Sequence, residues 1–227
     1  MTKVKVPLGL FMLLLMCASC SSVSSIRKAR DSFLHVVHKH TIQVCENNMC
    51  EARYVYSLGS GFVIGHLGEK TLGLTAGHVC TAKSESDGQV SVTTLKGAAV
   101  ISEEVLVYPS VDVCILTLPL QDIPARPIAR RAPRIGDKAF SISAPLGTFA
   151  PGMVPIFEGR YLGKVNSPLG MKLDAYSIPG TSGSSGGMII NEKGEVIGMT
   201  IMARVGFETF TLAVPYELLK TLLTKMP

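Results

Sequence analysis

The sequence predicts an all-β protein with two consecutive sets of strands followed by a short α-helix. Segments rich in β-branched and aliphatic residues recur between residues 34 and 214, with turn-forming residues between them. A Pro- and Arg-rich stretch, residues 119–134, has little apolar periodicity and separates the two sets. We therefore expect a first β-barrel over residues 34–118, a crossing segment over residues 119–134, and a second β-barrel over residues 135–214.

The expected strands are short and leave little room for helices. In the first set they lie near residues 34–44, 52–57, 60–66, 70–76, 88–95, 98–108 and 112–118. In the second set they lie near residues 137–144, 153–165, 169–177, 186–191, 194–203 and 208–214. Residues 215–227 are expected to contain the helix, because a proline opens this segment and leucines follow at helical spacing.

The N-terminal residues 1–22 have the features of an export signal. Lys3 and Lys5 precede an apolar run that is too short for a comfortable membrane span, and small residues follow it. The end of the segment resembles a bacterial lipoprotein processing site, which implies lipidation of Cys20 and attachment to a membrane. An ordinary cleaved signal peptide and an uncleaved N-terminal anchor are the alternatives. Residues 23–33, Ser-rich and then basic, are expected to form a tether.

The composition is that of a globular protein with a mild positive charge. The 227 residues are 47% hydrophobic and 17% charged, which suits one domain or two small barrels packed as a unit. The formal net charge is +5, and loss of two lysines with the signal leaves +3, too little to indicate a nucleic-acid partner. No motif implies a cofactor. His38 and His40 share a strand face, but a solvated strand edge is favoured over a metal site.

A glycine- and serine-rich stretch, residues 180–187, is the candidate active-site loop. Its glycines permit a tight turn with backbone N–H groups pointing outward, as needed to stabilise the oxyanion of an acyl-transfer reaction. By itself, this stretch is equally compatible with a flexible turn. Ser182, Ser184 and Ser185 are the possible nucleophiles, and only Ser185 has a glycine two positions before it and two glycines directly after it.

Two further segments favour a catalytic function. His78 follows an apolar strand, and Asp112 opens a run of residues that are typical of a buried strand. A serine hydroxyl is a poor nucleophile without an adjacent base. We therefore expect Ser185 to be the nucleophile, His78 its general base and Asp112 the residue that orients the imidazole.

These segments resemble a known family, the trypsin-like serine proteases. TAGHVC, residues 75–80, is similar to the histidine motif of that family, and GSSGG, residues 183–187, to its serine motif. Residues 59–64 and 112–116 most resemble the strand before the histidine and the aspartate motif of the bacterial HtrA (Deg) branch. The resemblance extends from about Ser57 to the C-terminus. It implies a chymotrypsin-like double β-barrel with a C-terminal helix. We expect no PDZ-type domain, because the residues after 214 leave no room for one, and in this the chain departs from full-length HtrA proteins.

The resemblance also implies a reaction and further site residues. The reaction is hydrolysis of peptide bonds in proteins or peptides through an acyl-enzyme intermediate. The oxyanion hole would use the N–H groups of Gly183 and Ser185. Pro179 stands at the base of the expected specificity pocket and carries no charge, so cleavage after Lys or Arg is not favoured. The remaining pocket residues form a strand segment with modest apolar side chains: Ile201, Met202 and Ala203.

Two other functions are compatible with the same motifs. One is a protease-fold module that binds peptides without cutting them, although such a module would not need the complete set of catalytic residues. The other is an esterase, which is less favoured because the strand–serine–helix context of the α/β-hydrolases is missing. The sequence predicts no particular oligomeric state.

The cysteines outside the export signal are candidates for disulfides. Cys45 and Cys50 flank a turn-like loop, and an oxidising compartment favours a hairpin disulfide between them. Cys80 and Cys114 each follow a catalytic candidate by two residues, so they can form a disulfide if the chain directions bring them together. Two separate buried thiols are the alternative. The spacing of these four cysteines does not indicate a metal site.

Overall fold

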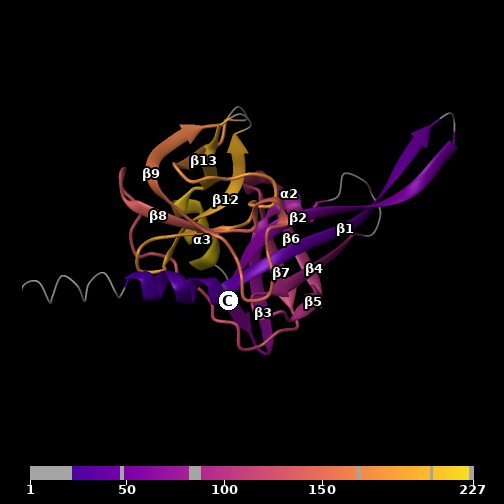
Figure 1. Ribbon diagram of the computed structural model, residues 1–227, viewed down its shortest axis with the longest axis horizontal. Coiled ribbons are helices and arrows are strands. Elements are labelled where there is room, and N and C mark those ends of the chain that lie inside the picture. Colours follow the sequence, from indigo (N-terminus) through magenta and orange to yellow (C-terminus); the bar gives the residue numbers. More distant parts are fainter. Residues whose placement is uncertain (1–21, 47–48, 82–87, 168–169, 205–206, 225–227) are drawn as a thin grey trace, which may run out of the picture.

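The computed structural model of the protein describes residues 22–46, 49–81, 88–167, 170–204 and 207–224 (Figure 1). Cys20 and nearly all of the expected export signal therefore lie outside the described residues. Within the described residues, no helix is both long and apolar enough to cross a membrane.

The segment that was expected to be a tether is instead packed against the protein. Residues 22–29 are helical, and the 3-10 helix η1 (Arg30–Ser32) follows them. Ala29 and Ser32 are fully buried, and Ile26 packs against the hydrophobic core. The physical reason is the spacing of Ile26 and Ala29, which puts two apolar side chains on one face of a helix despite the polar composition around them. The expectation of a tether over residues 23–33 is therefore wrong.

The first set of strands forms one antiparallel sheet of seven strands in the order β5-β4-β1-β2-β3-β7-β6. The two edge strands, β5 and β6, are consecutive in the chain with two residues between them. The sheet must therefore curl until its edges approach each other at that connection, although the edges are not paired as a closed barrel would require. The strands are β1 (Phe33–Glu46), β2 (Met49–Leu67), β3 (Lys70–Ala76), β4 (Gln89–Thr94), β5 (Ala99–Ile101), β6 (Glu104–Tyr108) and β7 (Val113–Leu118).

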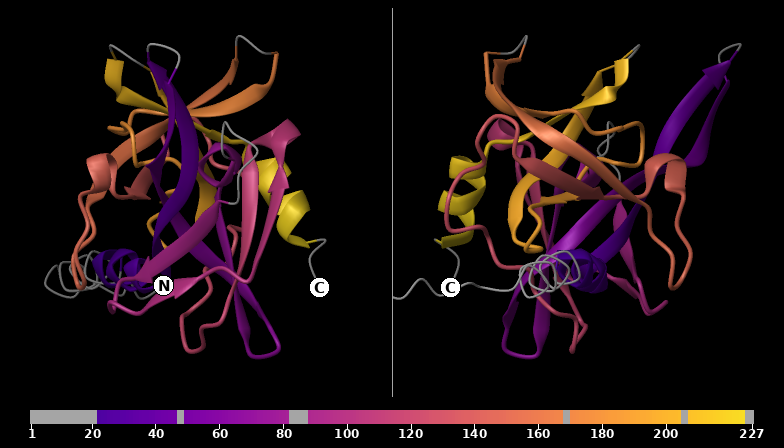
Figure 2. Two further views of the ribbon diagram at one scale, coloured as in Figure 1. Left: turned by 90° about the vertical axis from the view of Figure 1, so that its right-hand side faces the viewer. Right: turned by 60° about the vertical axis from the view of Figure 1, so that its left-hand side comes forward.

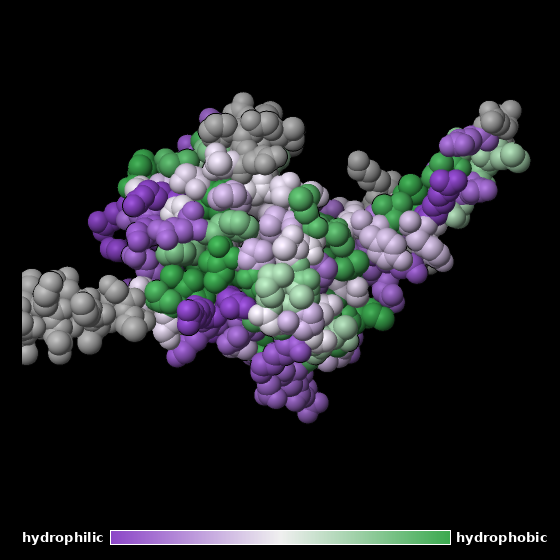
Figure 3. Space-filling model, in the orientation of Figure 1, coloured by the Kyte–Doolittle hydropathy of each residue, from purple (hydrophilic) through white to green (hydrophobic). Residues whose placement is uncertain are grey.

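The strands β1 and β2 form a long hairpin that extends well beyond the rest of the protein (Figure 1 and Figure 2). Cys45 and Cys50 are paired near its tip and are joined by a disulfide, with their Cα atoms 4.0 Å apart. The hairpin carries both hydrophilic and hydrophobic residues on the face visible in Figure 3. Its exposed large apolar side chains include Met49, Tyr54 and Tyr56.

The second set of strands closes into a six-stranded barrel in the order β10-β13-β12-β11-β8-β9. A helix, α3 (Tyr216–Thr224), follows the last strand, as expected, and buries Tyr216 and Leu219. The all-β class with a C-terminal helix is therefore confirmed. The strands are β8 (Lys138–Ile142), β9 (Ile156–Asn166), β10 (Lys172–Tyr176), β11 (Met188–Ile190), β12 (Val196–Arg204) and β13 (Phe207–Val214).

Hydrogen bonds of the crossing segment and of strand β2 join the two sheets. Residues 119–137 contain no regular element, but Ile128 forms a parallel bridge with Val196 of β12. The N–H of Arg126 donates to the carbonyl of Val63 in β2 at 3.0 Å. The N–H of Ser60, also in β2, donates to the carbonyl of Ser185 at 2.8 Å. The candidate active-site loop therefore lies where the two sheets meet.

Candidate active site

The structure brings His78 and Asp112 into direct contact. His78 lies on α2 (Gly77–Cys80), a single helical turn that directly follows β3, and Asp112 follows the 3-10 helix η2 (Pro109–Val111). Nδ1 of His78 lies 2.8 Å from Oδ2 of Asp112, and the backbone N–H of His78 donates to Oδ1 at 2.8 Å. An ionised Asp112 therefore favours the His78 tautomer with the proton on Nδ1 and the lone pair on Nε2. The Asp112 side chain is 22% exposed and that of His78 is 49% exposed.

The local sequence explains why these two residues approach so closely. Gly77 lies directly against Asp112, because a Cβ at this position would be 3.0 Å from Oδ1 of the carboxylate. Asp112 adopts a left-handed conformation with φ of 52°, which aspartate tolerates better than most residues do. A disulfide joins Cys80 to Cys114, whose Cα atoms are 6.4 Å apart, so a covalent bond connects the two segments.

The candidate loop between β10 and β11 is held against the end of β3. Gly183 and Gly186 have positive φ angles of 88° and 84°, so they adopt a conformation that favours glycine. The N–H of Gly186 donates to the carbonyl of Thr200 at 2.7 Å. A Cβ at Gly186 would lie 2.9 Å from the backbone nitrogen of Ala76, two residues before His78. The backbone next to Ser185 therefore packs against the segment that carries His78.

The three candidate serines have different environments. Ser184 is buried, and its hydroxyl accepts a hydrogen bond from the N–H of Thr181 at 3.3 Å, so it supports the loop from within. Ser182 is exposed, and its carbonyl accepts the N–H of Leu146 at 2.6 Å. Ser185 is half-buried and its hydroxyl has no hydrogen-bond partner in the described part of the chain, His78 included. The Ser182 hydroxyl also has no hydrogen-bond partner among the described residues, so position distinguishes the two serines: Gly186, directly after Ser185, packs against the segment that carries His78.

Two backbone donors of the loop are also uncommitted. Among the described residues, the N–H groups of Gly183 and Ser185 donate no hydrogen bond, whereas those of Ser184, Gly186 and Gly187 do. The carbonyl of Gly183 is held by the hydroxyl of Ser60 at 2.8 Å. Free N–H groups next to an accessible hydroxyl are suited to stabilising an oxyanion.

The expected pocket residues are only partly brought together. The N–H of Thr200 donates to the carbonyl of Gly187 at 2.9 Å, which places β12 beside the loop. Met202 is 44% exposed, whereas Ile201 is 5% exposed and belongs to the hydrophobic core, so their side chains point to opposite faces of the strand. Pro179 is exposed. The side chain of Ala203 lies outside the described residues.

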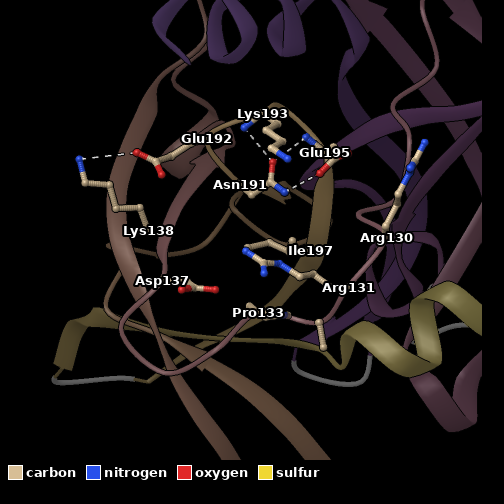
Figure 4. A pocket seen from close by; sticks show the side chains of 11 residues that line it. Arg130, Arg131, Pro133, Asp137, Lys138, Asn191, Glu192, Lys193, Glu195 and Ile197 are labelled. Carbon is tan, nitrogen blue, oxygen red and sulfur yellow. Dashed lines mark hydrogen bonds and ion pairs between the residues drawn. The ribbon is translucent and has the colours of Figure 1, made fainter. Parts of the chain in front are cut away.

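A cavity of about 490 Å³ lies away from these residues, at the β11–β12 turn (Figure 4). Its rim mixes cations and anions, with Lys138 3.9 Å from Glu192. None of its lining residues belongs to the segments that carry His78, Asp112 or Ser185. This cavity is therefore separate from the candidate active site.

The expectation that His38 and His40 lie at a solvated strand edge is wrong. Their side chains are buried, with 2% and 6% of the residue exposed, because β1 lies inside the sheet between β4 and β2. Sequence reasoning also missed the contact of Nδ1 of His38 with the carbonyl of Val79, the residue after His78. The available signal was the position of His38 and His40 on a strand face that also carries Leu34, Val36 and Ile42. No group of three or more possible metal ligands occurs among the described residues.

The fold and the candidate site define a class, the serine peptidases with two β-barrels. A family model described as "Trypsin-like peptidase domain" matches residues 59–199. The chain therefore belongs to the trypsin-like peptidase family, which confirms the resemblance seen in its motifs.

Known proteins with a similar sequence or structure agree with this assignment. The putative serine protease HhoB of Synechocystis sp. is 29% identical over 169 residues, which cover 70% of this chain and 38% of that protein. The structure of the HtrA-type protease AlgW with a decapeptide has a TM-score of 0.71 and 19% identity, over 90% of this chain and 66% of that one. A variant of AlgW with a decapeptide has a TM-score of 0.75 and 18% identity, over 90% and 67%. The expected chymotrypsin-like double-barrel fold is confirmed.

Proposed function

We propose that this protein is an active serine endopeptidase that uses Ser185, His78 and Asp112 as a catalytic triad. The observation that carries the proposal is the pair of contacts between His78 and Asp112, beside a loop whose Ser185 hydroxyl is accessible. The carboxylate keeps the proton on Nδ1 of His78, so Nε2 is left as a base. The family match and the HtrA-type relatives support the class of serine-type endopeptidases.

In the first half of the proposed reaction, Oγ of Ser185 attacks the carbonyl carbon of the scissile peptide bond while Nε2 of His78 takes the hydroxyl proton. The negative charge that develops on the carbonyl oxygen is stabilised by the N–H groups of Gly183 and Ser185. His78 then gives the proton to the leaving nitrogen, the C–N bond breaks, and the acyl group stays on Ser185.

In the second half, a water molecule attacks the acyl-enzyme as His78 removes its proton. The ester bond breaks, His78 returns the proton to Ser185, and the carboxylic acid product leaves. Asp112 stays ionised throughout and stabilises the imidazolium form of His78 in both halves.

The proposed substrates are proteins or peptides in an extended conformation. The AlgW structures contain a decapeptide or a tripeptide, which supports polypeptide substrates for this fold. Of the residues expected at the specificity pocket, Pro179 and Met202 have exposed side chains, and both are uncharged. Cleavage is therefore expected after small or aliphatic residues and not after Lys or Arg.

We also propose that the protein acts outside the cytoplasm, attached to a membrane through a lipid on Cys20. Two disulfides support an oxidising compartment. Lipid attachment would restrict the substrates to proteins near the membrane surface.

The proposal is tested by labelling with a fluorophosphonate and by cleavage of a peptide library. The wild-type protein should be labelled and should cleave peptides, whereas Ser185→Ala should do neither. Ser182→Ala is the matched control, because Ser182 lies in the same loop, and it should retain labelling. Equal labelling of wild type and Ser185→Ala would refute Ser185 as the nucleophile. Absence of labelling and of cleavage in the wild-type protein would favour the alternative of a protease-fold module that binds peptides without cutting them.

A further inference from the structure

The short helix that carries His78 is held from one side by several interactions. Asp112 accepts the N–H of His78, and the disulfide Cys80–Cys114 joins the end of the helix to β7. The helix α2 has only four residues, and no side chain caps its N-terminus. Such a short helix has little stability of its own, so its position depends on its neighbours.

On its other side, α2 is held by His38 of β1. Nδ1 of His38 lies 3.1 Å from the carbonyl oxygen of Val79. Position 38 is fixed firmly, because β1 pairs with β2 on one side and with β4 on the other, where His38 is opposite Ser57 and Val90. The residue is 2% exposed, and its Nε2 faces Gly88, where no Cβ could fit.

The direction of this hydrogen bond follows from the chemistry of its partner. A carbonyl oxygen can only accept, so Nδ1 of His38 must carry a proton and donate it. Burial lowers the pKa of His38 and the neighbouring His40 lowers it further, while the hydrogen bond to Val79 raises it; the pKa is lowered on balance, which favours the neutral ring, and the contact with the Val79 carbonyl places its proton on Nδ1. The Val79 carbonyl lies in a buried environment, where an unpaired acceptor is costly.

Val79 also connects this hydrogen bond to the Ser185 loop. Its side chain packs on Gly59, since a Cβ at Gly59 would be 2.7 Å from one of the Val79 methyl groups. The same Cβ would be 3.3 Å from the carbonyl oxygen of Ser185. A shift of Val79 would therefore move its neighbour His78 and disturb the packing beneath Ser185 at the same time.

We propose that His38 is a positioning residue of the peptidase, which fixes the Val79 carbonyl and thereby sets the distance between His78 and Ser185. This role rests on the proposed function. His38 touches neither substrate nor reacting atoms, and it acts only through the position of α2. A displacement of about 1 Å in a catalytic group can lower the rate by about 100-fold, so a single buried hydrogen bond at this place can control turnover.

The test compares His38→Asn with His38→Leu. The two replacement side chains have similar size and both lack the ring, but only the Asn amide nitrogen can replace the Nδ1–H donor. His38→Asn should keep most of the wild-type kcat, and His38→Leu should lower kcat by about 10- to 100-fold with little change in KM. All variants are assayed well below their thermal unfolding midpoints, so that loss of folded protein does not contribute.

The matched control is His40→Leu. His40 lies two residues along the same strand face and is similarly buried, and its Nδ1 has no hydrogen-bond partner among the described residues. If turnover depends on the hydrogen-bond donor at position 38 and not on the packing of this strand face, His40→Leu should retain a kcat within about threefold of wild type. Equal kcat values for His38→Asn and His38→Leu, or a loss in His40→Leu as large as in His38→Leu, would overturn the proposal.

A separate measurement keeps this inference distinct from the proposed function. Absence of fluorophosphonate labelling in the wild-type protein would refute the proposed function without testing His38. Nitrogen-15 NMR of the histidine rings then decides on the hydrogen bond. A neutral His38 ring protonated on Nδ1 supports the contact with Val79, and a ring protonated on Nε2 overturns it.

Discussion

The disulfide between Cys80 and Cys114 is expected to stabilise the fold and to hold the candidate active site together. Its removal by Cys80→Ala with Cys114→Ala frees a loop with a sequence separation of 34 residues. On the loop-entropy model, this lowers the free energy of unfolding by about 3–4 kcal/mol. For a protein of this size, that loss corresponds to a fall in Tm of roughly 6–16 °C. Both cysteines are buried, so the disulfide lies within a packed region of the protein.

The double variant should also lose turnover at temperatures where it is still folded, because the bond joins the segments of His78 and Asp112. The control is Cys45→Ala with Cys50→Ala, which removes a disulfide with a separation of 5 residues near the exposed tip of the hairpin. The assay is urea unfolding followed by circular dichroism, together with kcat on a peptide substrate. A stability loss below about 1 kcal/mol, or kcat values equal to those of the control, would refute the reasoning.

Three further predictions concern the loop, a buried carboxyl group and the N-terminus. Gly186→Ala should abolish peptide cleavage and destabilise the protein, because the added Cβ would collide with Ser60. The control Gly68→Ala has a similar positive φ but open space around the added Cβ, so it should lower the free energy of unfolding in urea by only about 1 kcal/mol. Equal effects of the two substitutions would contradict this reasoning. Burial raises the pKa of Asp174, so its contribution to stability is present below its ordinary pKa of 3.8 and is lost as the pH rises through the folded-state value. The free energy of unfolding of wild type minus that of Asp174→Asn should therefore fall as the pH rises above 3.8, and a difference independent of pH would be evidence against this. Palmitate labelling of the exported protein should be abolished by Cys20→Ala, and an unmodified mature N-terminus beyond Cys20 would instead establish ordinary signal cleavage.

Most strands could be predicted because alternating and aliphatic patterns reflect burial that each segment carries by itself. The boundary between the expected strands 52–57 and 60–66 was wrong, since both belong to the single strand β2. The glycines Gly59 and Gly61 lie inside this strand. In the structure Gly59 allows close approach, because Val79 and the Ser185 carbonyl occupy the space where a side chain would be.

The burial of His38 could not be read from the sequence for a related reason. Alternation along β1 shows which residues share a face, but not which elements cover that face. The helix α2 directly follows β3 and contacts β1, although β2 lies between β1 and β3 in the sheet. The same limit applies to Ile26 and Ala29, whose apolar face was hidden in a polar segment.

The sequence by itself determined the all-β class, the two sets of strands, the C-terminal helix and the family, because each depends on local patterns or on motifs that stand in a fixed order. Only the tertiary structure decided whether Cys80 and Cys114 meet. The two residues are far apart in the chain, and their distance depends on how β3, α2 and β7 are arranged. A single helical turn after β3 brings Cys80 over β7, and no local pattern encodes that long-range geometry.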